Sequence, residues 1–194
     1  MNPFHERLAR VALEVTASYG FALAGGYAVQ AHGFLDRPSA DVDLFAEASA
    51  QFDFTEAVDV VIAAYQRDGL EARAEARSSS FARLSVSSTD EQARVELGVD
   101  WRKNEPIRLA IGPVLHADDA VANKVCALFG RAEVRDYVDV AAILASGRGT
   151  PKRSSSALPP STITRRLPAG RLQSLHRPGR PHQARTFLCP AKIS

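Results

Sequence analysis

The stretch GGYAVQAHGFLDRPSADVDLF, residues 25–45, decides the class of fold that this 194-residue chain adopts. Two glycines follow a short apolar run at residues 21–24, and the pattern after them predicts a helix over residues 27–32. At the other end of the stretch, acidic and apolar residues alternate as they do in a strand that is buried on one face. The order of strand, glycine pair, helix, loop and strand predicts an α/β domain.

Helical and strand-like patterns alternate over the rest of the first 147 residues. The predicted helices cover residues 4–19, 54–65 and 133–144, together with a helix that His116 or Asp118 caps and that ends near residue 129. The predicted strands cover residues 39–45, 70–74, 81–87, 94–99 and 112–115. In the last helix, the apolar side is formed by Val134, Val138, Ala141 and Leu144.

The composition of the chain changes after Gly147. Residues 148–194 hold 7 of the 11 prolines and 10 Lys or Arg residues, with no Asp or Glu and no sustained period. The preceding part keeps 14 basic and 22 acidic residues, a balance of −8, although the whole chain has a net charge of +2. We therefore expect one domain over residues 1–147 and an irregular, disordered, basic tail rich in Pro, Arg and Ser over residues 148–194.

Composition also argues against several classes of protein. No apolar run approaches the ~20 residues of a membrane-spanning helix, and the N-terminus MNPFHERLAR lacks the apolar segment of a secretory signal. We therefore expect a cytoplasmic protein with no membrane partner. Cys126 and Cys189 form no CxxC pair, so neither a zinc site nor a disulfide framework is indicated.

The glycine pair and the two aspartates of residues 25–45 suit the chemistry of phosphates. Gly25 and Gly26 allow the backbone to approach a bulky anion, and the following helix directs its free N–H groups at that anion. Asp41 and Asp43 alternate on one strand, so both carboxylates project from the same face. Such a pair can hold two divalent cations, which at roughly 3.5–4 Å apart would stabilise both reacting oxygens of phosphoryl transfer.

These motifs are similar to the first motif of the polymerase-β-type nucleotidyltransferase fold, in which a G[G/S] pair precedes a DxD on the next strand. The segment VLHADDAVANKVCALFGRAEVRDYVDVAAIL, residues 114–144, resembles the AbiEii/MenT family of toxin nucleotidyltransferases. Proteins of that family carry a helix with a key lysine and then an R-D-x-x-D helix. The matching residues here are Lys124, Arg135, Asp136 and Asp139, and the resemblance covers roughly residues 10–146.

The resemblance implies an α/β, or α+β, fold, namely a polymerase-β-type nucleotidyltransferase core with a mixed sheet flanked by helices, followed by C-terminal helices. It also implies an enzyme that uses two Mg²⁺ ions to transfer NMP from an NTP, such as ATP or CTP, to the 3′ end of tRNA. This transfer blocks translation, and such a toxin is paired with a cognate antitoxin protein.

The same resemblance gives roles to individual residues. Asp41 and Asp43 become metal ligands. Lys124 reaches the triphosphate of the nucleotide, and Asp139 either orients Lys124 or acts as a base. The nucleotide-binding site is completed by Gly25, Gly26, Ser39 and Arg37.

A third carboxylate from a neighbouring strand usually completes such a metal site. Glu96 and Asp100 are four residues apart, so an ideal strand places both on one face, although Gly98 interrupts the pattern. We favour Glu96, because apolar residues flank it as they flank Asp43.

Two arginines have two possible roles each. Arg37, between the glycines and the aspartates, either contacts a phosphate or is a solvated loop residue. Arg135 either binds phosphate or forms ion pairs on the helix surface with Glu133 and Asp139.

Ser39 lies two residues before the first aspartate, at the place where a serine is phosphorylated in some members of the family. The resemblance therefore implies that an antitoxin with kinase activity silences the enzyme at Ser39. A phosphate group of about −1.5 to −2 charge beside the metal site would repel the incoming triphosphate.

Two other functions compete with this one. A small-molecule nucleotidyltransferase of the aminoglycoside type shares the glycine and DxD motifs, although the RDYVDV helix argues against it. A truncated, inactive toxin that only binds its antitoxin is suggested by the tail, because the family usually continues into further helices that shape the acceptor cleft. The tail itself is an RNA-binding segment, a dispensable disordered end or the product of a shifted reading frame, and we favour the last two.

Overall fold

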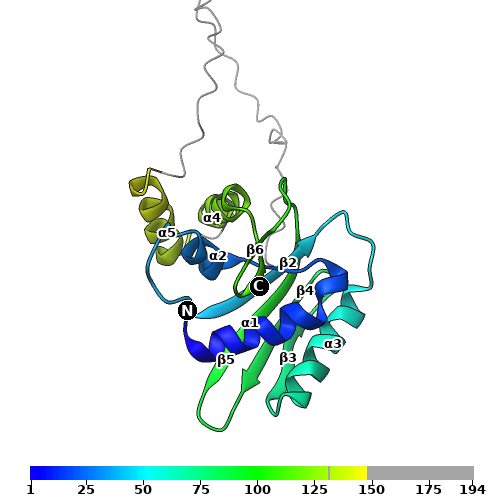
Figure 1. Cartoon of the computed structure of the whole chain (residues 1–194). Helices are drawn as coiled ribbons and strands as arrows, with labels where there is room; N and C mark the ends of the chain where they lie inside the picture. Colours follow the sequence, from blue (N-terminus) through cyan, green and yellow to red (C-terminus); the bar gives the residue numbers. More distant parts are fainter. Residues whose placement is uncertain (131, 148–194) are drawn as a thin grey trace, which may run out of the picture. The chain divides into compact units, whose positions relative to one another are not determined.

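The computed structural model describes residues 1–130 and 132–147, which form helices packed on a sheet (Figure 1). The helices are α1 (Pro3–Val15), the 3-10 turn η1 (Ala17–Tyr19), α2 (Gly25–Ala31), α3 (Phe54–Arg67), α4 (Ala117–Gly130) and α5 (Val134–Ala145). The strands are β1 (Ala22–Leu23), β2 (Asp41–Glu47), β3 (Glu71–Arg77), β4 (Phe81–Ser87), β5 (Gln92–Asp100), β6 (Ile107–Leu109) and β7 (Gly112–Val114). The predicted α/β class is confirmed.

The strands form one mixed sheet in the order β3-β4-β5-β2-β1-β7-β6. β2 lies at its centre, parallel to β5 and antiparallel to β1. β1 in turn is parallel to β7, although it contains only two residues. The glycine pair follows β1 after one residue and the aspartates begin β2, so the antiparallel pairing of these two strands brings both motifs together.

Helices cover the sheet in two groups. α1 packs on β2 and on α3, and α3 also packs on β3 (Figure 1). α2 packs on β2 and on α4, and α4 packs on α5. The mixed sheet flanked by helices, with two helices at the end of the described part, is the arrangement that the family resemblance implied.

The central strand β2 has two chemically different faces. Val42, Leu44 and Ala46 are at most 1% exposed and belong to the hydrophobic core, whereas Asp41 and Asp43 are only partly buried. Burial of a side chain such as Val42 or Leu44 contributes about 1.5–3 kcal/mol, and a slip of one residue would turn these side chains to the other face. The core therefore fixes the direction in which both carboxylates point.

Side-chain caps mark the starts of α1, α3 and α4, whereas α2 and α5 begin without one. Asn2 Oδ1 accepts from the Phe4 N–H at 2.7 Å, and Asp53 Oδ1 accepts from the Thr55 N–H at 2.8 Å. Each such cap is worth about 1 kcal/mol. Of the two caps predicted for α4, the structure has His116, whose Nδ1 accepts from the backbone N–H two residues later at 3.2 Å.

Several element boundaries differ from the prediction. α1 ends at Val15, and the last predicted helical residues form the separate turn η1, which closes at Gly20 with a φ of +70°. α2 begins at Gly25 itself, two residues before the predicted start. β5 continues through Gly98 to Asp100 without interruption, and β6 was not predicted.

Helix α5 lies with its apolar side outward. Val134, Val138 and Leu144 are 80%, 52% and 61% exposed, whereas Asp136 and Asp139 are fully buried. Amphipathic helices usually bury the apolar stripe. Here the inward side carries two carboxylates, and the buried charge of Asp139 is compensated by cations from other elements.

The predicted domain boundary at residue 147 and the basic segment 148–194 lie outside the described residues, so the division into a domain and a tail stays a prediction.

None of the helices in residues 1–130 and 132–147 combines the length and the apolar character needed to cross a membrane.

Candidate active site

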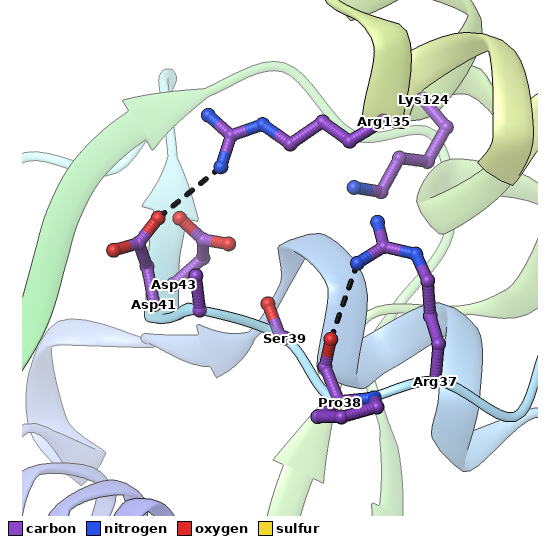
Figure 2. A pocket seen from close by; sticks show the side chains of 8 residues that line it. Arg37, Pro38, Ser39, Asp41, Asp43, Lys124 and Arg135 are labelled. Atoms are coloured by element: carbon purple, nitrogen blue, oxygen red, sulfur yellow. Dashed lines mark hydrogen bonds and ion pairs between the residues drawn. The ribbon is translucent and has the colours of Figure 1, made fainter.

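A polar pocket lies where the loop after α2, strand β2 and the helices α4 and α5 meet. Figure 2 shows Arg37 and Lys124 entering it from one side and the two aspartates from the other, with Arg135 reaching across. Segments that are about 80 residues apart in the sequence therefore meet in one pocket. Its lining consists of Arg37, Pro38, Ser39, Ala40, Asp41, Asp43, Lys124 and Arg135.

Gly25 is required by the side chain of Asp43. Gly25 has a φ of +57°, which residues other than glycine rarely adopt. A Cβ atom at this position would also lie 1.7 Å from Asp43 Oδ2. The backbone N–H of Ala24 donates to the Asp43 carbonyl at 2.8 Å and holds the two segments together. The structure thus shows a close approach between Gly25 and the Asp43 carboxylate, whereas the predicted approach of the glycine backbone to a bound phosphate stays a prediction.

Gly26 and Ser39 fit together in the same way. A Cβ atom at Gly26 would lie 2.7 Å from Ser39 Oγ, so a larger residue at position 26 requires the serine to move. Figure 2 shows the Ser39 hydroxyl between the aspartates and Arg37. The predicted nucleotide-binding residues Ser39 and Arg37 thus lie in the pocket that holds both aspartates.

The backbone of Ser39 is tied to α1 through two buried side chains. The Tyr27 hydroxyl donates to the Ser39 carbonyl at 3.2 Å, and His5 Nδ1 lies 2.6 Å from the same hydroxyl. The tautomer of His5 sets which of these two side chains donates the hydrogen bond that they share. Burial lowers the pKa of His5, while nearby Asp41 and Glu91 act in the opposite direction. No pattern in the sequence predicted this chain of contacts.

Asp139 is a buried carboxylate that holds two cations. Arg37 Nε donates to Asp139 Oδ1 at 2.7 Å, and Lys124 Nζ lies 2.8 Å from Asp139 Oδ2. Asp139 is 0% exposed and Lys124 8%, so water screens this cluster little. Arg37, although 30% exposed, is therefore paired with a buried carboxylate, and Lys124 contacts the same carboxylate.

Arg135 connects α5 to the metal-ligand candidates. Its Nη1 lies 3.4 Å from Asp41 Oδ2, and its Nε lies 2.7 Å from Glu133 Oε2. The predicted ion pair with Glu133 is confirmed. The alternative partner Asp139 is engaged by Arg37 and Lys124, and the contact with Asp41 spans 94 positions that no local pattern could connect.

Glu96 and Asp100 lie at different distances from the aspartate pair. Glu96 is the register neighbour of Asp43 on the parallel strand β5, whereas Asp100 is opposite Glu47. Four residues along a strand are roughly 13 Å, so only Glu96 is adjacent to Asp43. Glu96 is 4% exposed and its Oε1 lies 3.0 Å from Arg83 Nη2. Burial raises the pKa of Asp100.

The donor set of the pocket suits magnesium. Within residues 1–130 and 132–147, no group of three or more His, Cys, Asp or Glu side chains is arranged to hold a metal ion. The pocket offers the carboxylates of Asp41 and Asp43. Mg²⁺ commonly keeps several waters and binds one or two carboxylates together with substrate phosphates. A two-carboxylate site that a nucleotide completes fits this ion.

Comparison with known proteins identifies the fold and the family of the chain. The sequence model of the family described as "Nucleotidyl transferase AbiEii toxin, Type IV TA system" matches residues 7–158. The crystal structure of JHP933 from Helicobacter pylori has a TM-score of 0.51 at 20% identity, covering 71% of this chain and 63% of that one. MenT4, the nucleotidyltransferase toxin Rv2826c from Mycobacterium tuberculosis, has a TM-score of 0.47 at 19% identity, covering 70% and 56%.

The chain thus spans about three-fifths of the length of JHP933, with which it shares a fold. No curated protein sequence matches. The resemblance predicted from the sequence is confirmed by the family match.

Proposed function

Because this chain belongs to the family of AbiEii nucleotidyl transferase toxins of type IV toxin–antitoxin systems, we propose that it transfers NMP from an NTP to the 3′ end of tRNA. The terminal hydroxyl oxygen of the RNA would attack the α-phosphorus and give up its proton to solvent water, while the bond to the β-phosphate breaks and pyrophosphate leaves. The observation that carries this proposal is the meeting of Asp41, Asp43 and Lys124 in one pocket. Modification of the 3′ end would block aminoacylation and so translation, and an antitoxin would counter it.

Asp41 and Asp43 would hold Mg²⁺, which supplies charge neutralisation at the reacting phosphate oxygens when it is bound. Glu96 is proposed as the third carboxylate of the metal-bound protein, since it neighbours Asp43 in the sheet, although the described residues hold no group of three such side chains already arranged around a metal. Its ion pair with Arg83 would then keep the carboxylate oriented beside the pair.

The basic residues would bind the triphosphate. Lys124 presents an ammonium group to the pocket, and Asp139 fixes its position at 2.8 Å. We propose that Asp139 orients Lys124 and does not act as a base, because both of its oxygens contact cations. Arg37 is held by the same carboxylate, so a phosphate group would meet two cations that are already in place.

Ser39 is proposed as the regulatory site. Its side chain lines the pocket close to Asp41. A phosphate of about −1.5 to −2 charge on this hydroxyl would repel both the aspartates and the incoming triphosphate. An antitoxin with kinase activity could therefore silence the enzyme by one modification.

The proposal is tested by incubating purified protein with each labelled NTP, Mg²⁺ and a tRNA pool. We expect label in the tRNA with one preferred nucleotide, and a loss of at least about 100-fold in the Asp41→Asn variant. The matched control is Asp59→Asn, which removes a carboxylate from a surface ion pair with Arg77 and should leave transfer unchanged.

Other outcomes would contradict the proposal. Transfer to an aminoglycoside but not to RNA would support a small-molecule enzyme. Binding of an antitoxin without any transfer would support an inactive toxin. Equal labelling by wild type and Asp41→Asn would show that the pocket described here is not the site of chemistry.

A further inference from the structure

Arg135 contacts Asp41, the carboxylate that the proposed function assigns to a metal ion. Its Nη1 lies 3.4 Å from Asp41 Oδ2, and its side chain lines the same pocket as Asp43 and Lys124. Figure 2 shows the guanidinium reaching from α5 across the pocket to this carboxylate. A guanidinium and a divalent cation repel each other, so both cannot use the same oxygen of Asp41 at close range.

The partners of Arg135 differ from those of the other two cations in the pocket. Arg37 and Lys124 are both held by Asp139, whose side chain is 0% exposed. Arg135 is held by side chains that reach solvent, Asp41 at 19% and Glu133 at 49% exposure, and is itself 40% exposed. Its contacts are therefore better screened and less costly to exchange.

We propose that Arg135 is a phosphate-binding residue with two positions, and this inference rests on the proposed function. In the protein without nucleotide, its guanidinium neutralises Asp41. With Mg²⁺ and the triphosphate bound together, Asp41 would be a metal ligand, and the planar fork of Arg135 would instead donate two parallel hydrogen bonds to phosphate oxygens.

This exchange makes the binding of metal and of nucleotide cooperative. Metal alone must displace Arg135 from Asp41 and leave the arginine with one carboxylate partner fewer. Metal with nucleotide displaces the same arginine but gives it a new anionic partner. Each ligand thus raises the affinity for the other, as linkage requires of coupled sites.

The test measures binding without catalysis. Mn²⁺ serves as the metal probe, and its unbound fraction is followed by electron paramagnetic resonance, first alone and then with a nonhydrolysable NTP analogue. In Arg135→Gln we expect Mn²⁺ alone to bind at least 3-fold tighter, because the competing cation is gone. We expect the analogue to bind at least 10-fold weaker at saturating Mn²⁺, because its phosphate partner is gone.

Two matched variants guard against indirect effects. Arg77→Gln removes an arginine from a surface ion pair with Asp59 and should leave both affinities at the wild-type value. Arg135→Lys keeps the charge but loses the fork, so the analogue should still bind more weakly while Mn²⁺ alone binds as in wild type. This variant decides the question if Arg135→Gln fails to fold, as judged by circular dichroism.

The opposite signs of the two changes separate this role from a structural one, since general loosening of the pocket would weaken both ligands. Unchanged or weaker Mn²⁺ binding in Arg135→Gln, or unchanged binding of the analogue, would overturn the inference.

The Asp41→Asn variant distinguishes a failure of this inference from a failure of the proposed function. If Asp41→Asn binds Mn²⁺ with the wild-type affinity, the proposed metal site is wrong, and both the proposed function and the role of Arg135 are rejected. If it loses Mn²⁺ while Arg135→Gln matches wild type, only the role of Arg135 is rejected.

Discussion

Gly25 lies so close to the carboxylate of Asp43 that its identity restricts where this proposed metal ligand can lie. In Gly25→Ala the new methyl group would meet Asp43 Oδ2 at 1.7 Å, so the carboxylate must move. A displacement of about 1 Å can lower the rate about 100-fold, and the left-handed backbone adds about 1–2 kcal/mol of destabilisation. We expect nucleotidyl transfer to fall by this order while the protein remains folded.

Gly69→Ala is the matched control for this prediction. Gly69 has a φ of +77°, but nothing lies within 4 Å of a Cβ atom placed there. It should therefore show the same loss of stability in urea unfolding with full activity. Equal activities of the Gly25 and Gly69 variants would show that Asp43 tolerates the displacement and is not a metal ligand.

The sequence predicts some residues of the site better than others. Asp41 and Asp43 were placed on one face because alternation along a strand is a local property. The clash between Gly25 and Asp43 depends on the antiparallel pairing of β1 with β2, and a two-residue strand gives no pattern that would indicate its partner. The contact of Arg135 with Asp41 requires the placement of α5, which is equally non-local.

At the scale of single elements, α5 yields a direct test of its orientation. Ile143 is 2% exposed and its neighbour Leu144 is 61% exposed. Replacement of a buried isoleucine by alanine costs about 2–5 kcal/mol, whereas an exposed substitution stays within about 0.5 kcal/mol. We therefore expect Ile143→Ala to lower the free energy of unfolding in urea strongly and Leu144→Ala to leave it nearly unchanged. The reverse order would mean that α5 packs with its apolar stripe inward.

The bridge between α1 and α2 makes stability depend on pH. Burial lowers the pKa of His5 from its ordinary 6.5, so the unfolded chain binds a proton more readily than the folded protein. The free energy of unfolding should therefore be highest above pH 6.5. It should decrease as the pH is lowered from 6.5 to the pKa of His5 in the folded protein, by at most about 1.4 kcal/mol per pH unit. Urea unfolding at pH 7.5, 6.5 and 5.5 checks this.

His5→Asn supplies the control for the pH effect. Asparagine can still donate to the Tyr27 hydroxyl but does not titrate. Its free energy of unfolding should fall less steeply over the same interval. If wild type and variant show the same pH dependence, the effect belongs to other groups.

The periodicity of the sequence predicted that α5 is a helix, but it did not predict that the apolar side of this helix is exposed. The apolar stripe of Val134, Val138 and Leu144 is plain in the sequence, yet these residues are exposed. Asp139 faces inward because its charge is paired with Arg37 and Lys124, and those partners come from distant segments. A pattern of hydrophobicity cannot foresee a buried polar cluster whose members are far apart in the chain.

At the scale of the whole molecule, the hydrophobic core of the described part is built from residues between Phe4 and Ile143. A chain that ends at residue 147 should therefore unfold cooperatively, with a thermal midpoint within about 3 °C of the full-length protein. Circular dichroism during heating measures this midpoint. A larger fall would show that residues 148–194 contribute to the stability of the protein.

The charge asymmetry of the chain was visible from composition alone. Residues 148–194 contain 10 basic residues and no acidic ones, whereas the preceding 147 residues have a net charge of −8. The sheet order and the site pocket, by contrast, needed coordinates, because both depend on contacts between segments that no single window of sequence contains.

Asp139 also constrains how this protein can evolve. One buried negative charge serves two positive ones that come from the loop at Arg37 and from α4 at Lys124. A neutral residue at position 139 would leave the positive charges of Arg37 and Lys124 close together without a carboxylate between them, at a buried position. A lineage that loses this aspartate must therefore replace a partner as well, and descendants should inherit the three positions as a set.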